Sequence, residues 1–178
     1  MIKLENICKS YDEKTVLDNI MAEFPDDSIT CIMGESGAGK TTLVRIIAGL
    51  ENADRGTVSG AGVVSFDFQE DRLINDISAA DNIMLVLDKN DFGGHDKKTM
   101  RKIINENLAE VLKDYPSDKS TGTYSGGMKR RVCLVRAMMK KSDTVILDEP
   151  FSALDYQTRL SVSDEIGTII REEGKTAI

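Results

Sequence analysis

The stretch "GESGAGKT", residues Gly34–Thr41, constrains the fold of this chain more than any other part of the sequence. It fits the pattern G-x-x-x-x-G-K-[ST] at each fixed position. A short, β-rich apolar run, Ser28–Gly34, leads into it, and apolar residues recur after it at i, i+3, i+4 and i+7 from Leu43. We therefore predict a buried strand over residues 28–34, a phosphate-binding loop, and a helix that begins near Lys40.

The residues of this loop predict how a nucleotide is held. Small residues let several backbone N–H groups point into one concavity, and the N-terminus of the following helix adds positive potential. We expect Lys40 to reach the β- and γ-phosphates of ATP, and the Thr41 hydroxyl to bind Mg²⁺. The residues predicted to contact ATP here are Gly34, Glu35, Ser36, Gly37, Ala38, Gly39, Lys40, Thr41 and Thr42.

Two acidic residues, Asp148 and Glu149, follow the apolar run "TVIL" further along the chain. The carboxyl ends of parallel strands are where α/β folds bind their ligands. Because side chains alternate in direction along a strand, the two acids need different roles. We predict that Asp148 holds Mg²⁺ through water, and that Glu149 orients the attacking water or accepts its proton. The alternative, a solvated acidic turn, is disfavoured by the phosphate loop upstream.

Strand and helix patterns alternate along the chain, which predicts an α/β fold with a mainly parallel sheet. The run Ile2–Tyr11 indicates an edge strand, and "GTVSGAGVVSFDFQ" indicates a hairpin and a further strand. Helices are predicted at Lys97–Leu112, 130–140 and 157–171. Two more strands are predicted at 143–150 and 174–178, and a polar connector at 114–123.

Bulk properties narrow the classes of function. The net charge of −7 argues against a nucleic-acid partner, because neutralising a phosphate backbone needs a basic face. The longest uninterrupted aliphatic run, Ile83–Leu87, is far too short for a membrane span. The isolated cysteines Cys8, Cys31 and Cys133 are expected to be reduced and largely buried. We therefore expect a cytoplasmic chain that reaches a membrane only by docking onto another protein.

A second glycine-rich stretch, "YSGGMKRRVCLVRAM", starts at Tyr124. Two adjacent glycines suit a loop that opens a helix and lets the backbone approach a ligand. The stretch resembles the signature motif of ABC-type ATPases, usually written LSGGQ and followed by an alanine–arginine–alanine helix. The residues that match as they stand are Ser125, Gly126, Gly127, Arg131, Arg136 and Ala137. Tyr124 replaces the usual leucine of the motif, and Met128 replaces the usual glutamine.

The resemblance extends along most of the chain in the order of the family's motifs. It implies that the Tyr11 ring stacks on adenine, that Gln69 senses Mg²⁺ and the attacking water, and that Asp155 in "FSALD" forms the D-loop. The implied fold is a single domain over residues 1–178 with a RecA-like P-loop NTPase core, an antiparallel β subdomain and a helical insertion. The core would be about 1–70 and 141–178, and the helical subdomain about 71–140.

The resemblance also implies partners. Two copies of the chain would form a head-to-tail dimer, in which the Ser125 hydroxyl and the Gly127 N–H of one copy donate to the γ-phosphate bound by the other. The segment "FQEDRLINDISAADNI" is similar to importers of the nitrate, sulfonate and taurine type. This likeness implies an ATPase that powers transport across a membrane, bound to a separate permease on the inner face of the cell membrane.

The end of the sequence differs from the family pattern. Members carry a switch histidine after the strand that "GKTAI" would open, whereas this sequence ends at Ile178 and its one histidine is His95, within the predicted helical insertion. Either the chain is truncated before that region or it is an unusually short member of the family, and we expect truncation. Two alternatives to a transport ATPase stay open: a soluble ABC-type nucleotide switch, and an ATP-binding regulatory module that does not hydrolyse ATP.

Overall fold

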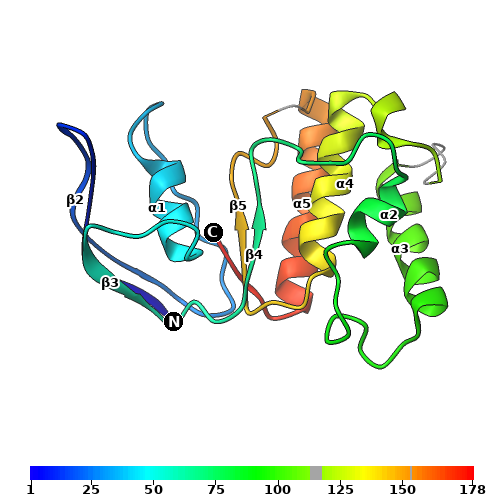
Figure 1. Cartoon of the computed structure of the whole chain (residues 1–178), viewed down its shortest axis with the longest axis horizontal. Coiled ribbons are helices and arrows are strands. Elements are labelled where there is room, and N and C mark those ends of the chain that lie inside the picture. Colours follow the sequence, from blue (N-terminus) through cyan, green and yellow to red (C-terminus); the bar gives the residue numbers. More distant parts are fainter. Residues whose placement is uncertain (113–117, 153) are drawn as a thin grey trace. The chain divides into compact units, whose positions relative to one another are not determined.

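The computed structural model covers residues 1–178 and describes all of them except 113–117 and 153 (Figure 1). The chain forms two compact units, each with its own apolar core. The first unit contains Met1–Phe66, Ser142–Asp148 and Gly167–Ile178, and the second contains Asp67–Lys141 and Glu149–Ile166. The boundary therefore falls between the two neighbouring acids of the predicted site.

The first unit begins with a three-stranded antiparallel sheet. Strand β1 (Ile2–Tyr11) pairs with β2 (Lys14–Phe24) across the turn at Asp12 and Glu13, and with β3 (Arg55–Ser59) on its other side. The strand order is β2-β1-β3, so the prediction of an edge strand at the N-terminus is wrong. The strand becomes central because β3, from much later in the chain, pairs with its second edge.

Strands β3 and β4 (Val64–Asp67) do not form the predicted hairpin, because they belong to different sheets. Gly60 and Gly62, with φ of 80° and 61°, redirect the chain between them. A Cβ atom on Gly60 would lie 2.2 Å from the Met1 carbonyl oxygen, and one on Gly62 would lie 2.4 Å from a carboxylate oxygen of Asp143. These two positions therefore need glycine for close backbone packing as well as for their backbone angles.

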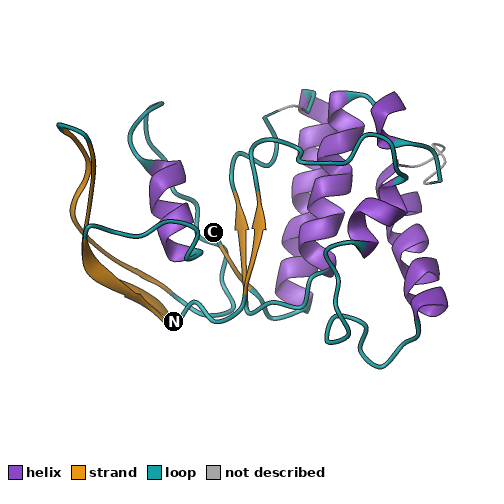
Figure 2. Ribbon diagram, in the orientation of Figure 1, coloured by secondary structure: helices purple, strands orange, loops and turns teal. Residues whose placement is uncertain are grey.

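The second sheet has the order β4-β5-β6. Strand β5 (Thr144–Leu147) pairs in parallel with β6 (Thr176–Ala177). The arrows of β4 and β5 point in the same direction in Figure 2. The sequence predicted both β5 and the start of a strand at "GKTAI", since apolar runs bounded by turn residues carry a local signal.

The predicted buried strand over residues 28–34 is wrong in its extent. Only Ile29 pairs, through an isolated parallel bridge to Ala177. Strand β6 is two residues long, so it offers no partner to the rest of the segment. Met33 is 87% exposed and Cys31 is exposed as well, which corrects the expectation that this cysteine is buried.

Helix α1 (Lys40–Ile47) begins where the sequence predicts. Its apolar face is buried, with Leu43, Val44, Ile46 and Ile47 each at most 9% exposed. These side chains pack into one core with buried residues of β1, β2 and β5. Burial of this face holds the end of the phosphate loop against the sheets of the first unit.

The second unit is helical. Helices α2 (Ala79–Met84), α3 (Lys97–Leu112) and α4 (Gly126–Met139) pack against one another (Figure 1). A short 3₁₀ turn, Thr121–Thr123, precedes α4 and is the end of the predicted connector, of which residues 114–117 lie outside the described part. Helix α5 (Tyr156–Glu172) begins in this unit and ends in the first.

The bounds of α3 agree with the sequence prediction, because its apolar residues follow the helical period closely. Met100, Ile104, Leu108 and Leu112 are buried at successive turns of one face. They form a core with residues of α2 and α4.

None of the helices in the described part of the chain combines the length and apolar character needed to cross a membrane.

Candidate functional site

The loop that precedes α1 has the backbone shape its glycines predict. Gly37 and Gly39 have φ of 80° and 86°, a left-handed conformation that glycine adopts easily. A Cβ atom on Gly39 would lie 2.9 Å from Val16 Cγ1 and 3.1 Å from the Val16 carbonyl oxygen. Residues 33–38 are exposed. The loop thus presents its backbone to solvent at the N-terminus of α1, where anions are favoured.

Lys40 folds back over this loop. Its ammonium group donates to the carbonyl oxygens of Gly34 and Glu35, both at 2.8 Å. The positive charge is therefore held at the loop by partners of the loop itself. Ammonium groups bind phosphate oxygens as point charges, so the lysine is placed to bind a phosphate in the same region.

Thr41 and Asp148 meet within the first unit. The Thr41 hydroxyl donates to Asp148 Oδ1 at 3.1 Å, although the two residues are far apart in the sequence. Thr41 is the second residue of α1, and Asp148 follows β5 and is only 7% exposed. The structure thus brings together two of the three residues predicted to hold Mg²⁺.

The donor set fits Mg²⁺, which prefers oxygen ligands and keeps several waters. Thr41 supplies a hydroxyl oxygen and Asp148 a carboxylate oxygen. Among the described residues, no group of three or more His, Cys, Asp or Glu side chains could hold a metal ion. Two protein oxygens would therefore leave most of the coordination shell to water and phosphate, as in sites where Mg²⁺ binds together with a nucleotide.

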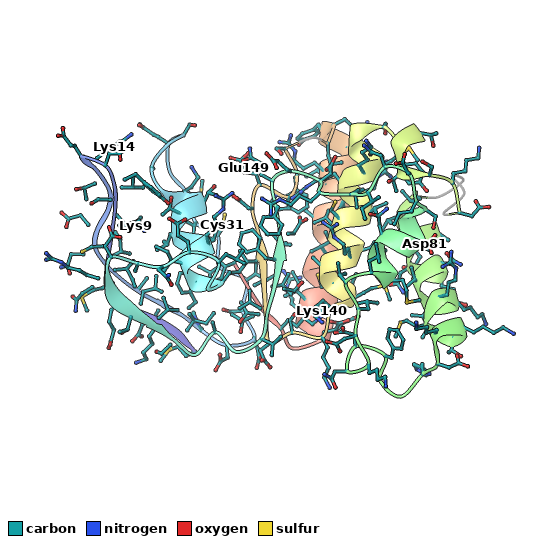
Figure 3. All side chains as sticks on the ribbon, viewed as in Figure 1. Lys9, Lys14, Cys31, Asp81, Lys140 and Glu149 are labelled. Carbon is teal, nitrogen blue, oxygen red and sulfur yellow. The ribbon has the colours of Figure 1, made fainter. Side chains whose placement is uncertain are left out.

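Tyr11 lies at the end of β1 and is 44% exposed. Its hydroxyl donates to the Glu51 carboxylate and also contacts the Thr42 side chain. The hydrogen bond to Glu51 raises the pKa of Tyr11 above its usual value, so the phenol stays protonated near neutral pH. The ammonium group of Lys9, labelled in Figure 3, lies 5.4 Å from the centre of the ring. This network places the predicted adenine-stacking ring beside Thr42, in the first turn of α1.

Glu51 is a site residue that the sequence patterns did not reveal. A single glutamate after a helix is ordinary surface composition, so no local signal marks it. Its contact with Tyr11 joins the end of β1 to the segment that follows α1, which only the folded chain shows. Lys9 belongs to the same cluster of side chains as Tyr11 and Glu51. Its pKa is raised above the ordinary value, chiefly by its hydrogen bond to Asp54.

Gln69 and Glu149 meet within the second unit. Gln69 Nε2 donates to Glu149 Oε2 at 3.0 Å. Glu149, labelled in Figure 3, has φ of 51°, an uncommon backbone conformation for a residue with a side chain. Its carbonyl oxygen accepts from the Ser152 N–H at 3.2 Å and from the Ser152 hydroxyl at 3.1 Å, which holds this turn. Strained backbone of this kind concentrates at functional sites.

The second glycine stretch opens α4. Ser125 is the N-cap, and its Oγ accepts from the Met128 N–H at 3.3 Å. Gly126 and Gly127 are the first residues of the helix, where N–H groups have no acceptor inside the helix. Tyr124 is buried, and Met128 packs against the same apolar core. The two residues that depart from the family motif are therefore used in packing.

Asp155 lies directly before α5 and is exposed. Its carbonyl oxygen accepts from the Arg159 N–H at 2.8 Å, which starts the helix. The structure thus divides the predicted site residues between the two units. The loop, Asp148 and Tyr11 lie in the first unit, whereas Gln69, Glu149 and the residues around Ser125 lie in the second.

Comparisons with known proteins bear on this arrangement. The sequence profile described as ABC transporter matches residues 17–152. A sulfate/thiosulfate import ATP-binding protein of Vibrio vulnificus (strain CMCP6) is 35% identical over 170 residues, covering 89% of this chain and 49% of the relative. An aliphatic sulfonates import ATP-binding protein of Nocardia farcinica (strain IFM 10152) is 34% identical over 169 residues, covering 95% of this chain and 66% of the relative. The chain thus spans less than two thirds of the length of these relatives.

Solved structures show the same fold. A dimeric ATP-binding cassette in a post-hydrolysis state, bound to ADP and Pi, matches with a TM-score of 0.86 at 25% identity, over 99% of this chain and 86% of that chain. An ABC transporter ATP-binding protein from Pyrococcus furiosus matches with a TM-score of 0.82 at 24% identity, over 99% and 89%. These matches confirm the predicted P-loop NTPase fold. Because the family profile covers most of the sequence, from residue 17 to residue 152, the chain belongs to the ABC transporter family.

Proposed function

We propose that this chain is the ATP-binding and ATP-hydrolysing subunit of a system that imports a solute across a membrane. The observation that carries the proposal is the hydrogen bond of 3.1 Å between Thr41 and Asp148. It joins the phosphate loop to a buried strand-end carboxylate, and P-loop NTPases hold Mg²⁺ with this pair of residue types. The relatives named above are import ATP-binding proteins, which supports the transport role.

Binding of MgATP would use residues of the first unit. The loop N–H groups and Lys40 bind phosphate oxygens, and the Tyr11 ring stacks on adenine. Thr41 and Asp148 hold Mg²⁺. The residue proposed to sense the ion, Gln69, belongs to the second unit. The bound ion supplies charge neutralisation at the phosphates.

Hydrolysis would depend on Glu149. Its carboxylate accepts a hydrogen bond from Gln69, which orients it. A carboxylate held in this way positions a water molecule for attack and takes up its proton. Because phosphoryl transfer relies mainly on positioning and charge stabilisation, the main contribution of Glu149 would be to hold the water in line with the phosphate.

Two copies of the chain would act together as a head-to-tail dimer that closes on ATP. The start of α4 supports this role, since a helix N-terminus with glycine N–H groups and a serine hydroxyl favours the negative charge of phosphate. We infer that Ser125 and Gly127 bind the γ-phosphate held by the other copy, and that Asp155 lies at the same dimer interface. The similar cassette bound to ADP and Pi is itself dimeric.

A separate membrane permease would hold the dimer at the inner face of the cell membrane. The printed names of the relatives, which are ATP-binding proteins of import systems, support this partner. Purification of the tagged chain from membranes of its own cells, with identification of the bound proteins, tests it. Recovery of a membrane-spanning protein is expected. A chain that is recovered without one would favour the alternative of a soluble nucleotide switch.

Phosphate release from MgATP tests the enzymatic part of the proposal. We expect Glu149→Gln to bind MgATP like the parent chain and to release phosphate about 10²–10⁴ times more slowly, because only the base is lost. Glu106→Gln is the matched control, since Glu106 lies on α3 with its side chain 61% exposed. Its phosphate release should equal that of the parent. A parent chain that binds MgATP without releasing phosphate would instead be the regulatory module considered above.

A further inference from the structure

The second unit contains a buried ion pair. Arg130 and Asp67 are each 1% exposed, and Arg130 Nη2 donates to Asp67 Oδ2 at 2.6 Å. Arg130 lies in the first turns of α4, whereas Asp67 is the last residue of β4. A buried ion pair is weak evidence for stability, because well-packed apolar residues of similar volume often serve as well. The remaining contacts of Arg130 therefore matter for its role.

The other donors of Arg130 reach two backbone carbonyl groups beside the Gln69–Glu149 pair. Nη1 donates to the Phe68 carbonyl oxygen at 2.5 Å, and Nε donates to the Pro150 carbonyl oxygen at 2.8 Å. Phe68 directly precedes Gln69, and Pro150 directly follows Glu149. One guanidinium group thus binds both chain segments that bring the Gln69 amide and the Glu149 carboxylate to 3.0 Å.

Helix α4 also holds the chain on the other side of Gln69. Cys133 Sγ donates to the Asp71 carbonyl oxygen at 2.9 Å. Arg136 donates to the carbonyl oxygens of Asp71 and Arg72, each at 3.0 Å. The segment that carries Gln69 is therefore attached to α4 both before and after this residue.

We propose that Arg130, together with Asp67, is a positioning residue that sets the Gln69–Glu149 pair and links it to the start of α4. The inference rests on the proposed function, because it concerns the residues assigned there to hydrolysis. Arginine suits this task, since its planar fork donates to several acceptors at fixed angles, whereas lysine offers a single point charge. Contact of a second copy's nucleotide with Ser125–Gly127 would then be transmitted through α4 to the residues that act on water.

Arg130→Lys tests the proposal, because lysine keeps a positive charge beside Asp67 but does not reach both carbonyl groups. We expect kcat for MgATP to fall by about 10²-fold, the usual effect of a small misplacement of catalytic groups, while KM changes by less than about twofold. Combined with Gln69→Ala, the loss of kcat should be smaller than the product of the two single losses, because both changes act on one pair.

The matched control is Arg101→Lys. Arg101 lies in the same unit and also pairs with an aspartate, donating to Asp81 Oδ1 at 2.5 Å, but both side chains are more than 40% exposed, at 44% and 43%. We expect this variant to keep the kcat of the parent. A double variant, Asp67→Asn with Arg130→Gln, removes both buried charges together. It is used in place of Arg130→Lys if the Arg130→Lys variant does not fold. It should show the same loss of kcat.

A second readout does not depend on activity. The NMR resonance of the Gln69 side-chain amide, identified by its absence in Gln69→Ala, should shift in Arg130→Lys and stay in place in Arg101→Lys. A parent chain that releases no phosphate contradicts the proposed hydrolysis, and the resonance alone then decides on Arg130. The inference is overturned if the resonance does not move in Arg130→Lys. It is equally overturned if the losses of kcat multiply as for independent sites.

Discussion

Lys40 shows at the scale of a single residue how the loop prepares for a nucleotide. Its ammonium group is held by two loop carbonyl oxygens, those of Gly34 and Glu35. In these bonds only the donor is charged, whereas a phosphate oxygen adds the attraction of an opposite charge to the same ammonium group. Phosphate oxygens are therefore expected to be better partners for this lysine than the carbonyl oxygens that hold it, which would favour the proposed binding of ATP.

Lys40→Ala removes this charge, and we expect ATP to bind at least about tenfold more weakly, since hydrogen bonds to charged groups contribute about 1.5–3 kcal/mol. Titration of the chain with a fluorescent ATP analogue measures the effect. Arg45→Ala is the control, because Arg45 is a basic residue in the last turn of the same helix. Equal affinity of Lys40→Ala and the parent would remove Lys40 from the site.

At the scale of an element, the glycines that flank α1 determine how the phosphate loop enters the helix and how the chain leaves it. Gly39 is the residue before α1, with a left-handed backbone and no room for a Cβ atom beside Val16. Gly49, just beyond the end of the same helix, is also left-handed, with φ of 67°, but nothing lies within 4 Å of a Cβ atom there. An alanine at Gly49 would therefore cause backbone strain alone, whereas an alanine at Gly39 would cause backbone strain and steric overlap with Val16.

Gly49→Ala should lower the free energy of unfolding by about 1–2 kcal/mol, the usual cost of a left-handed residue with a side chain. Gly39→Ala should lower it further, because the added methyl group would also lie 2.9 Å from Val16 Cγ1. Urea unfolding of both variants and the parent measures the difference. Equal losses in the two variants would show that the loop moves freely away from Val16.

Helix α4 carries a buried thiol whose titration reports on its packing. Burial raises the pKa of Cys133 from 9.0 to about 12. An unfolded chain releases this proton near the ordinary value of 9.0, so between the two pKa values the folded state binds a proton that the unfolded state has lost. The contribution to stability is complete below this window and decreases as pH rises through it.

We therefore expect the free energy of unfolding to fall by about 1.4 kcal/mol per pH unit between about pH 9 and the folded pKa, from this group alone. Urea unfolding at a series of pH values measures the slope. Cys133→Ala should show a slope that is smaller by this amount. If both chains have the same slope, Cys133 does not retain its proton in the folded state.

At the scale of the whole molecule, the chain is divided into two units with separate cores, and the predicted site residues are divided with them. Asp148 ends a segment of the first unit, and Glu149 starts a segment of the second. The peptide bond between them joins the residue proposed to hold Mg²⁺ to the residue proposed to activate water. The proposed dimer adds the start of α4 from a second copy.

ATP-dependent dimerisation is best followed in Glu149→Gln, which should retain bound ATP. We expect light scattering to give twice the monomer mass of 19.6 kDa with MgATP and the monomer mass without it. Adding Ser125→Asp should keep the chain monomeric while it still binds ATP. Aspartate is a good N-cap and preserves α4, but its charge repels the phosphate of a second copy. Dimers of this double variant would contradict the proposed role of Ser125.

The sequence predicted the elements whose signal is local. The glycine pattern at Gly34–Thr41 and the apolar period of α3 each lie within a few turns of chain, so they could be recognised without a fold. Strand β2 and the central place of β1 were not recognised, because pairing partners are chosen across the fold and not along the chain. The antiparallel sheet itself was expected only from the resemblance to ABC-type ATPases.

Contacts between residues distant in the sequence account for the rest of the site. Glu51 reaches Tyr11, Thr41 reaches Asp148, and Arg130 reaches the segment before Gln69. Sequence motifs can identify the binding and catalytic residues, because only a few residue types can perform each of these chemical roles. The partners that orient those groups come from folding, because burial and strand pairing bring them together, and almost any polar residue at the right place in space can fill such a role.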